Sequence, residues 1–192
     1  EVVDPQQTAP SAQHAASVMQ RLHTSPLIAI AAVHGGAWAG GAALMAACDL
    51  VVASTEVQIA FPAARRGVVP SLILDLVRAR VSDGDLRDLF LTGLPADAAT
   101  AQRMGLVQRV APVQELLAEA QTVAEAIVRG GPQTIRDTKA LMNSVLSDTT
   151  DLDKALEAGV RGHLEAQCSG EAEEGLAAFL ERRRPWWDLS GD

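Results

Sequence analysis

Four glycines in the stretch "AAVHGGAWAGGAALMAACDLVVAS", residues 31 to 54, have the spacing of a turn that feeds a helix. Gly35 and Gly36 follow an apolar run, and Gly40 and Gly41 precede "AALMAAC", which is rich in good helix formers. The first residues of a helix present backbone N–H groups without intrahelical partners, and the helix macrodipole favours negative charge there. Glycine also lets a carbonyl group approach the backbone closely. The spacing therefore predicts either an oxyanion-binding turn or a tightly packed strand–helix junction, and it leaves both open.

The same stretch has two further interpretations, a membrane span and a nucleotide-binding loop. Residues 27 to 48 are long enough for a membrane span, which takes about 20 apolar residues. Each internal glycine costs up to about 1 kcal/mol in a helix interior, however, and no basic residues anchor the flanks. The glycines do not fall at relative positions one, three and six, and no Gly-Lys-Ser/Thr sequence follows them. We therefore expect neither a membrane segment nor a nucleotide loop.

Composition narrows the class of protein. The chain has 192 residues, 48% hydrophobic content and a formal charge of −8, with a pI near 5.0. An excess of acidic residues is unsuited to neutralising phosphates, so we expect no nucleic-acid partner. Cys48 and Cys168 have no spacing typical of a disulfide framework or of a metal site. The first residues have neither a basic start nor an apolar h-region. These features predict a soluble, cytoplasmic protein without a metal.

Sequence patterns around the glycine turn predict the elements that position it. The apolar runs 27–33, 49–54 and 57–61 read as strands, and the glycine turn between the first two leads into a helix. A helical pattern follows from residue 70, then a short helix ended by Gly105 and a strand at 106–110. Longer helices are expected at 11–24, 113–129, 132–146, 152–167 and 171–183. The pattern predicts an α/β part, residues 1–111, and a helical part, residues 112–192.

The chain resembles the enoyl-CoA hydratase/isomerase, or crotonase, superfamily. The glycine stretch, "VQIAFPAARRGVVPS", "LFLTG", "AQRMGLVQRVAP" and the closing "GLAAFLERRRPWW" agree with that family in order and spacing, over residues 11 to 187. The resemblance implies the α/β crotonase (ClpP-like) fold of repeated ββα units, with a C-terminal helical region that mediates trimerisation, commonly as a dimer of trimers. It also implies an acyl-CoA thioester ligand, with coenzyme A as part of the substrate and no separate cofactor. Relative to the family fold, the first strands are expected to be missing before Glu1.

The family's chemistry stabilises a thioester enolate with two backbone N–H groups. The resemblance places one of these at Gly40 and the other in an upstream segment that this sequence does not contain. The family's hydratases use two glutamates as acid and base, and both matched positions are alanine, Ala43 and Ala63. Alanine transfers no proton, and loss of a general acid or base costs about 10² to 10⁴ in rate. We therefore expect a lyase or isomerase of the hydratase/isomerase type that hydrates crotonyl-CoA poorly.

Two alternatives follow from the missing acids. One is decarboxylation of a carboxylated acyl thioester, with His163 of "VRGHLEAQCS" near the acyl pocket; the other is a protein that carries acyl-CoA or mediates protein interactions without catalysis. The sequence favours a solvent-facing or interface position for His163 over this catalytic role. Asp49 begins a strand and is expected to satisfy backbone groups.

The resemblance also suggests substrate-binding residues. Trp38, inside the glycine turn, is expected at the wall of the acyl pocket, and Gly41 and Pro62 are also expected to bind the substrate. Arg65 and Lys139 are basic side chains that could meet the anionic groups of coenzyme A. A solvated surface cation is the alternative for both of them.

Overall fold

The computed structural model describes residues 5–147 and 152–189. The chain divides into two compact units, of which unit 1 comprises Glu1–Ser25 and Ala29–Ala120, and unit 2 comprises Pro26–Ile28 and Gln121–Asp192. This division follows packing. The domains predicted from the sequence, 1–111 and 112–192, stay a prediction.

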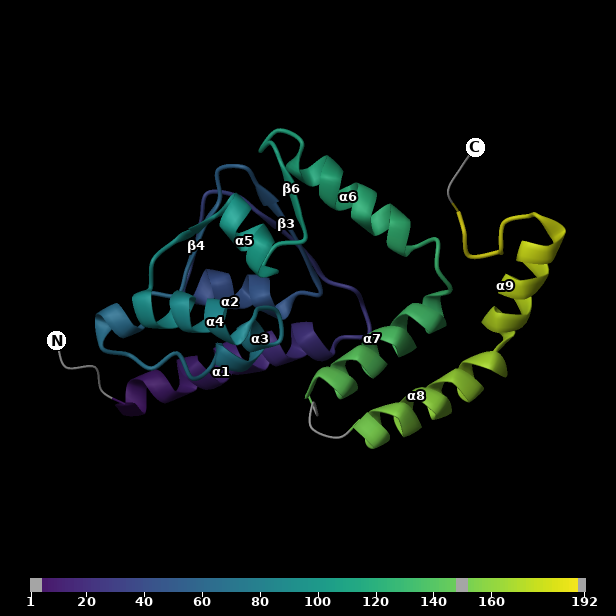
Figure 1. The fold of residues 1–192 in the computed structure, drawn as a ribbon, viewed down its shortest axis with the longest axis horizontal. Helices are drawn as coiled ribbons and strands as arrows, with labels where there is room; N and C mark the ends of the chain where they lie inside the picture. The colour runs from purple at the N-terminus through teal and green to yellow at the C-terminus, as the bar shows by residue number, and fades with distance from the viewer. Residues whose placement is uncertain (1–4, 148–151, 190–192) are drawn as a thin grey trace. The chain divides into compact units, whose positions relative to one another are not determined.

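Unit 1 contains the strands and most of the short helices (Figure 1). In chain order its elements are α1 (Pro5–Thr24), β1 (Ile30–Val33), β2 (Gly36–Trp38), α2 (Gly40–Ala47), β3 (Leu50–Ser54), β4 (Gln58–Ala60), η1 (Ala64–Arg66), α3 (Leu74–Arg78), α4 (Asp83–Arg87), η2 (Asp88–Thr92), β5 (Ala96–Asp97), α5 (Ala98–Met104) and β6 (Arg109–Ala111). Helix α6 (Leu116–Ile127) contains the boundary between the units, and α7 (Pro132–Ser147), α8 (Leu152–Gln167) and α9 (Gly170–Glu181) belong to unit 2.

The strands of unit 1 form two small sheets. In the first, β3 lies between β1 and β6 and is parallel to both, with Ile30 opposite Leu50 and Val52 opposite Arg109. Figure 1 shows β3 and β6 side by side. In the second sheet β4 is parallel to β2 and antiparallel to β5. Parallel strands need crossover connections, and α2 is the crossover between β1 and β3.

The core of unit 1 lies between the sheets and the helices. Alternate residues of β3 and of the stretch around β4 are buried in it, as a pleated strand requires. Phe61 stacks on Phe90 of η2, with ring centroids 4.8 Å apart. Full burial of a side chain of this size contributes about 1.5 to 3 kcal/mol. The core therefore fixes the ends of β4 and the residues that follow it.

One strand was missed by the sequence patterns. Residues 36 to 38 were expected to be part of a glycine turn, but Gly36, Ala37 and Trp38 form β2 and pair with β4. Gly36 and Trp38 lie on the same strand face, and the Trp38 indole occupies the space that a Cβ at residue 36 would take. The indole thus fills the space that a side chain at residue 36 would occupy. The glycines indicated a turn, although these residues form a strand.

The predicted strand at 106–110 also differs, because β6 begins at Arg109. The Gln108 side chain accepts a hydrogen bond from Val51 N–H over 2.8 Å, and Gln108 N–H donates to the Val51 carbonyl over 3.0 Å. Leu106 and Val107 are buried outside the strand. Gly105 has a φ of 94°, and a Cβ there would lie 2.6 Å from the Arg80 carbonyl oxygen. Glycine is therefore required at this turn.

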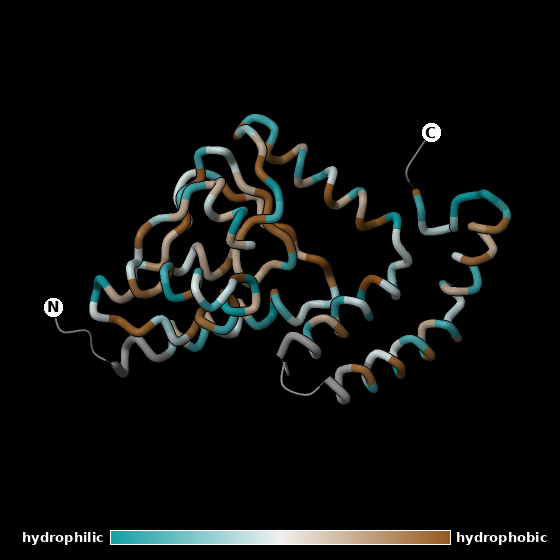
Figure 2. Tube along the Cα trace, viewed as in Figure 1, coloured by the Kyte–Doolittle hydropathy of each residue, from teal (hydrophilic) through white to brown (hydrophobic). Residues whose placement is uncertain are grey.

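The expected helices are confirmed, with ends that differ by a few residues, and α1 extends further toward the N-terminus than expected. Figure 2 shows apolar and polar residues alternating along α8, where Leu156, Val160 and Leu164 are exposed. In unit 2 the Glu171 carboxylate accepts hydrogen bonds from Gln133 N–H and Thr134 N–H, both over 2.8 Å, at the start of α7. Among the described residues, no helix has the length and apolar content needed to cross a membrane.

Candidate functional site

Helix α2 starts from a residue in an uncommon conformation. Ala39, the residue before it, has φ 47° and ψ −106°, a region that non-glycine residues rarely adopt. Two backbone hydrogen bonds hold it: Ala39 N–H donates to the Ala60 carbonyl over 3.0 Å, and Ala43 N–H donates to the Ala39 carbonyl over 2.9 Å. The turn is therefore fixed both to β4 and to the first turn of α2.

The Gly40 N–H is one of the donor groups that this turn presents, together with the N–H groups of Gly41 and Ala42, which also precede the bond from Ala43 N–H to the Ala39 carbonyl. Gly40 is the first residue of α2, so its N–H precedes the first intrahelical hydrogen bond. In the described part of the chain this N–H has no hydrogen-bond partner. A Cβ at Gly40 would meet no atom within 4 Å beyond its own helix and chain neighbours. A ligand atom can therefore approach the Gly40 backbone.

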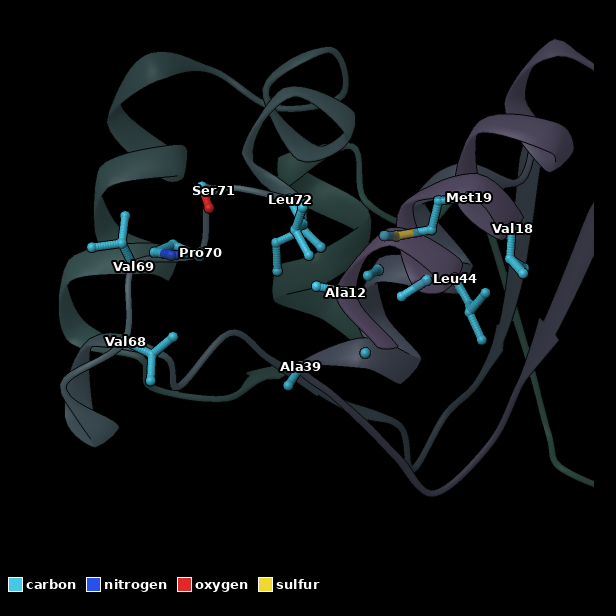
Figure 3. Close-up of a pocket in the computed structure, with 14 residues that line it drawn as sticks. Ala12, Val18, Met19, Ala39, Leu44, Val68, Val69, Pro70, Ser71 and Leu72 are labelled. Carbon is cyan, nitrogen blue, oxygen red and sulfur yellow. The ribbon is translucent and has the colours of Figure 1, made fainter. Parts of the chain in front are cut away.

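Gly40 lines a cavity of about 710 Å³, here called the first cavity (Figure 3). Its walls come from three segments: α1, the start of α2, and the stretch from Val68 to Ile73. Figure 3 shows Val68, Val69 and Ser71 on one side and Val18, Met19 and Leu44 on the other. Apart from the Ser71 hydroxyl, the described lining side chains are apolar. The site thus combines a backbone donor with a predominantly apolar wall, an arrangement suited to an acyl group with one polar atom.

The two alanine positions differ in their surroundings. Ala43 also lines the first cavity, is 1% exposed and packs with Met19 and Ala47. Ala63 is half-buried, directly precedes η1, and is not among the lining residues. Neither side chain can transfer a proton. The geometry therefore brings Gly40 and Ala43 together in one cavity and leaves Ala63 outside its lining.

The predicted binding residues of unit 1 lie beside the lining rather than in it. Trp38 is partly exposed over Gly36. The Arg65 guanidinium donates from Nε to the Thr92 carbonyl over 2.7 Å. A Cβ at Gly93 would lie 3.1 Å from Pro62 Cα and 3.4 Å from Arg65 Cδ, so both residues pack against that turn. Gly41 is exposed and does not line the cavity. Their roles in binding stay predictions.

Lys139 and His163 both belong to unit 2. Lys139 is 2% exposed, and its ammonium group donates from Nζ to the Leu27 carbonyl over 2.9 Å. His163 is exposed on α8. The burial of Lys139 gives this side chain a structural contact that its basic character did not predict. The predicted roles of both residues toward a ligand stay predictions.

Two structural features of the site were not anticipated from the sequence. The first is the wall formed by Ala12, Ala15, Val18 and Met19 of α1, and the second is the wall from Val68 onward. Two adjacent valines between Arg66–Gly67 and Pro70 are the available signal for the second wall. Helix α1 shows ordinary helical spacing, which does not reveal what its apolar face covers.

The far end of α2 is also held by a side chain. The Arg80 guanidinium donates from Nε to the Ala46 carbonyl over 3.0 Å and from Nη2 to the Cys48 carbonyl. Burial lowers the pKa of Arg80, while Cys48 and Asp49 oppose that shift. Asp49 in turn accepts a hydrogen bond from Ala29 N–H over 2.7 Å, which confirms its expected role at the backbone. A cation at the C-terminal end of α2 complements the helix macrodipole.

The sequence of this chain is similar to a family model and to curated proteins. The family model described as enoyl-CoA hydratase/isomerase matches residues 3–189. A putative enoyl-CoA hydratase of Thermus thermophilus is 36% identical over 180 residues, which are 90% of this chain and 69% of that protein. A probable enoyl-CoA hydratase of Mycobacterium bovis is 35% identical over 158 residues, which are 81% of this chain but 60% of that protein. The chain thus spans less than two thirds of some of the curated relatives that it matches.

Solved structures agree with this assignment. The crystal structure of an enoyl-CoA hydratase from Mycobacterium smegmatis has a TM-score of 0.89 and 28% identity, and the match covers 96% of this chain and 71% of that one. A Bacillus anthracis enoyl-CoA hydratase gives a TM-score of 0.91 with 26% identity, over 97% of this chain and 72% of that one. These structures confirm the crotonase fold that the sequence motifs predicted.

Proposed function

This chain belongs to the enoyl-CoA hydratase/isomerase family, and on that premise we propose that it binds an acyl-CoA thioester with the thioester oxygen against the Gly40 N–H. The observation that carries the proposal is that Gly40, whose N–H has no described partner, lines a cavity with apolar walls. The N–H meets the oxygen, and the apolar wall meets the acyl chain. Coenzyme A enters as part of the substrate, so no separate cofactor is proposed.

The chemical contribution that this site supports is stabilisation of negative charge that develops on the thioester oxygen. A fixed backbone donor next to a low-dielectric wall stabilises a developing enolate more than water does, because it needs no reorganisation. Ala43 supplies no acid or base from the cavity wall, and Ala63 supplies none beside it. The proposal is therefore binding and polarisation of the thioester, without hydration by a pair of glutamates at these positions.

Association through the helical part is the second component of the proposal. Leu156, Val160 and Leu164 recur every four residues on α8 and are each more than half exposed. Spacing of this kind places them on one helix face, where burial against another copy would remove apolar surface from water. We propose a homotrimer or a dimer of trimers in the cytoplasm. Sedimentation velocity at micromolar concentration tests this, and a stable monomer would contradict it.

Isothermal titration with acyl-CoA esters tests the binding proposal. The wild type is expected to bind at least one ester, and Gly40→Pro is expected to abolish binding because proline has no N–H. Proline is tolerated at the first position of a helix, but Ala39 lies outside the extended region that a residue before proline prefers, so the test includes circular dichroism and thermal unfolding of Gly40→Pro, which should match those of the wild type. Gly170→Pro is the matched control, because Gly170 is the first residue of α9 and is also exposed. No binding of any ester by the wild type, or unchanged binding by Gly40→Pro, would contradict the proposal.

A further inference from the structure

A second cavity in unit 1 shares a wall with the first. This second cavity has a volume of about 560 Å³ and is lined by Ala64, Gly67, Val68, Val69, Pro70, Ser71, Leu74, Asp75, Phe90 and Leu91. Val68, Val69, Pro70 and Ser71 also line the first cavity. These four consecutive residues are here called the partition. A single stretch of chain thus separates the site at Gly40 from a second, mainly apolar hollow.

The partition is attached to the rest of the fold mainly at its ends. At one end Val68 N–H donates to the Ala63 carbonyl over 3.0 Å, next to Gly67, whose φ is 70°. At the other end Ile73 N–H donates to the Pro70 carbonyl over 3.2 Å. Within the described residues, the N–H groups of Val69 and Ser71 form no hydrogen bond. Few backbone bonds therefore oppose a displacement of the partition.

The side chains of the partition face water to an extent that is unusual for their type. Val69 is 80% exposed and Val68 is 58% exposed. Leu91 of η2, which also lines the second cavity, is 72% exposed. An apolar chain that passed over the partition would cover these side chains, and burial of apolar surface is favourable roughly in proportion to its area.

From these observations we propose that the partition sets the acyl-chain length of the ligand, and that the distal methylenes of a long acyl chain occupy the second cavity. The inference rests on the proposed function, because the acyl group enters from the first cavity. The occupant follows from the shared wall: a chain held at Gly40 that outgrows the first cavity reaches the second across Val68 to Ser71. A short acyl group stays in the first cavity and does not contact Leu91.

Leu91→Glu tests the inference. A carboxylate in the second cavity is unfavourable for methylenes, and Leu91 is too exposed for its replacement to unfold the protein. Each methylene excluded from an apolar site costs about fourfold in affinity, so loss of two or more predicts a decrease of about tenfold or greater. Titration with dodecanoyl-CoA should show that decrease, while butyryl-CoA should bind with an affinity within about twofold of the wild type.

Leu94→Glu is the matched control, because Leu94 is 54% exposed and lines neither cavity. It should leave both affinities unchanged. Equal weakening of both esters by Leu91→Glu, or no weakening of dodecanoyl-CoA, would overturn the inference while the proposed function stands. A smaller sedimentation coefficient for Leu91→Glu would identify the second cavity as a contact between copies and would also overturn it. Absence of binding of either ester to the wild type would overturn the proposed function together with the inference.

Discussion

The N–H of Ala39 donates to the carbonyl oxygen of Ala60 over 3.0 Å, so the residue that precedes α2 is tied to the end of β4. Ala39 adopts φ 47° at this point, and Gly40 follows as the first residue of the helix. The uncommon backbone conformation is therefore imposed by the sheet and sets the direction in which α2 begins. Strain of this kind persists where surrounding structure fixes it, and it is frequent at functional sites.

Substitution of Ala39 measures that strain. Ala39→Val should lower the free energy of unfolding by about 1 to 3 kcal/mol, because a β-branched side chain is poorly accommodated at positive φ. Ala39→Gly should be neutral or stabilising. Chemical denaturation provides the measurement. The control is Ala79→Val, since Ala79 is exposed with φ −67° and should change stability by less than about 0.5 kcal/mol. Equal stability of Ala39→Val and the wild type would contradict the assignment of strain.

Replacement of Ser54, unlike that of Ala39 by valine, is predicted to stabilise the protein. Its hydroxyl is buried at the end of β3, the side chain is 1% exposed, and Oγ has no hydrogen-bond partner in the described residues. An unsatisfied buried hydroxyl costs about 1 to 3 kcal/mol, so Ser54→Ala should raise the free energy of unfolding by about 1 kcal/mol. Thermal unfolding of the two proteins gives the comparison. A lower melting temperature for Ser54→Ala would show that the hydroxyl has a partner.

The contacts of Glu171 predict that the free energy of unfolding depends on pH. Partial desolvation raises the pKa of its carboxyl, but hydrogen bonds from the Gln133 and Thr134 backbone and from the Thr134 hydroxyl, together with Arg136, outweigh this and hold the pKa below its usual range. Because the folded pKa is depressed, the stabilisation is present above the unfolded pKa and is lost as the pH falls through the folded pKa. Glu171→Gln should remove this contribution to the acid dependence of unfolding.

At neutral pH, Glu171→Ala should cost about 1 kcal/mol, the typical value for loss of a side chain that caps a helix. Urea unfolding at several pH values provides both measurements. Glu173→Ala is the control, since Glu173 lies in the same first turn of α9 and is exposed. An unchanged pH dependence in Glu171→Gln would show that the contacts with α7 contribute nothing to stability.

Hydration of crotonyl-CoA tests the consequence of Ala43 and Ala63. Enzymes of ordinary efficiency turn over at about 1 to 10³ per second, and loss of a general acid or base lowers the rate by about 10² to 10⁴. The wild type should therefore hydrate crotonyl-CoA at least about 10²-fold below that range. Turnover at an ordinary rate would show that another group acts as acid and base. Carbon dioxide release from a carboxylated thioester, lost in His163→Ala, would favour the decarboxylase alternative.

The sequence predicted the elements whose signals are local. Helix α2 was predicted from the run of helix formers after Gly40, and the long helices from their apolar spacing, because both depend on neighbouring residues. Strand β2 was not predicted, since Gly36 resembles a turn residue until the Trp38 indole is seen against it. The late start of β6 depends on a side-chain bond between Gln108 and Val51, which are 57 residues apart.

The candidate site was predictable only in part, for a similar reason. Gly40 and Ala43 lie three residues apart on one helix, so their common placement follows from helical geometry. The walls from Val18, Met19 and the partition are tertiary contacts between distant segments. The burial of Lys139 was not predictable from its neighbours in the sequence, because its contact with the Leu27 carbonyl joins residues that are 112 positions apart. The family resemblance thus predicted Gly40 as the donor, and tertiary structure defined the cavity around it.

The most direct test of the account is the infrared carbonyl band of butyryl-CoA labelled with carbon-13 at the thioester carbonyl. A donor fixed in a low-dielectric site polarises the C=O bond more than water does. The account predicts a band at lower wavenumber in the wild-type complex than in water, and the same low band with Gly170→Pro. At ligand concentrations that force binding, the band of the Gly40→Pro complex should return toward that of the free ester. A wild-type complex whose band matches the free ester, or a shifted band that survives in Gly40→Pro, would contradict the assignment of the Gly40 N–H as the oxygen-binding group.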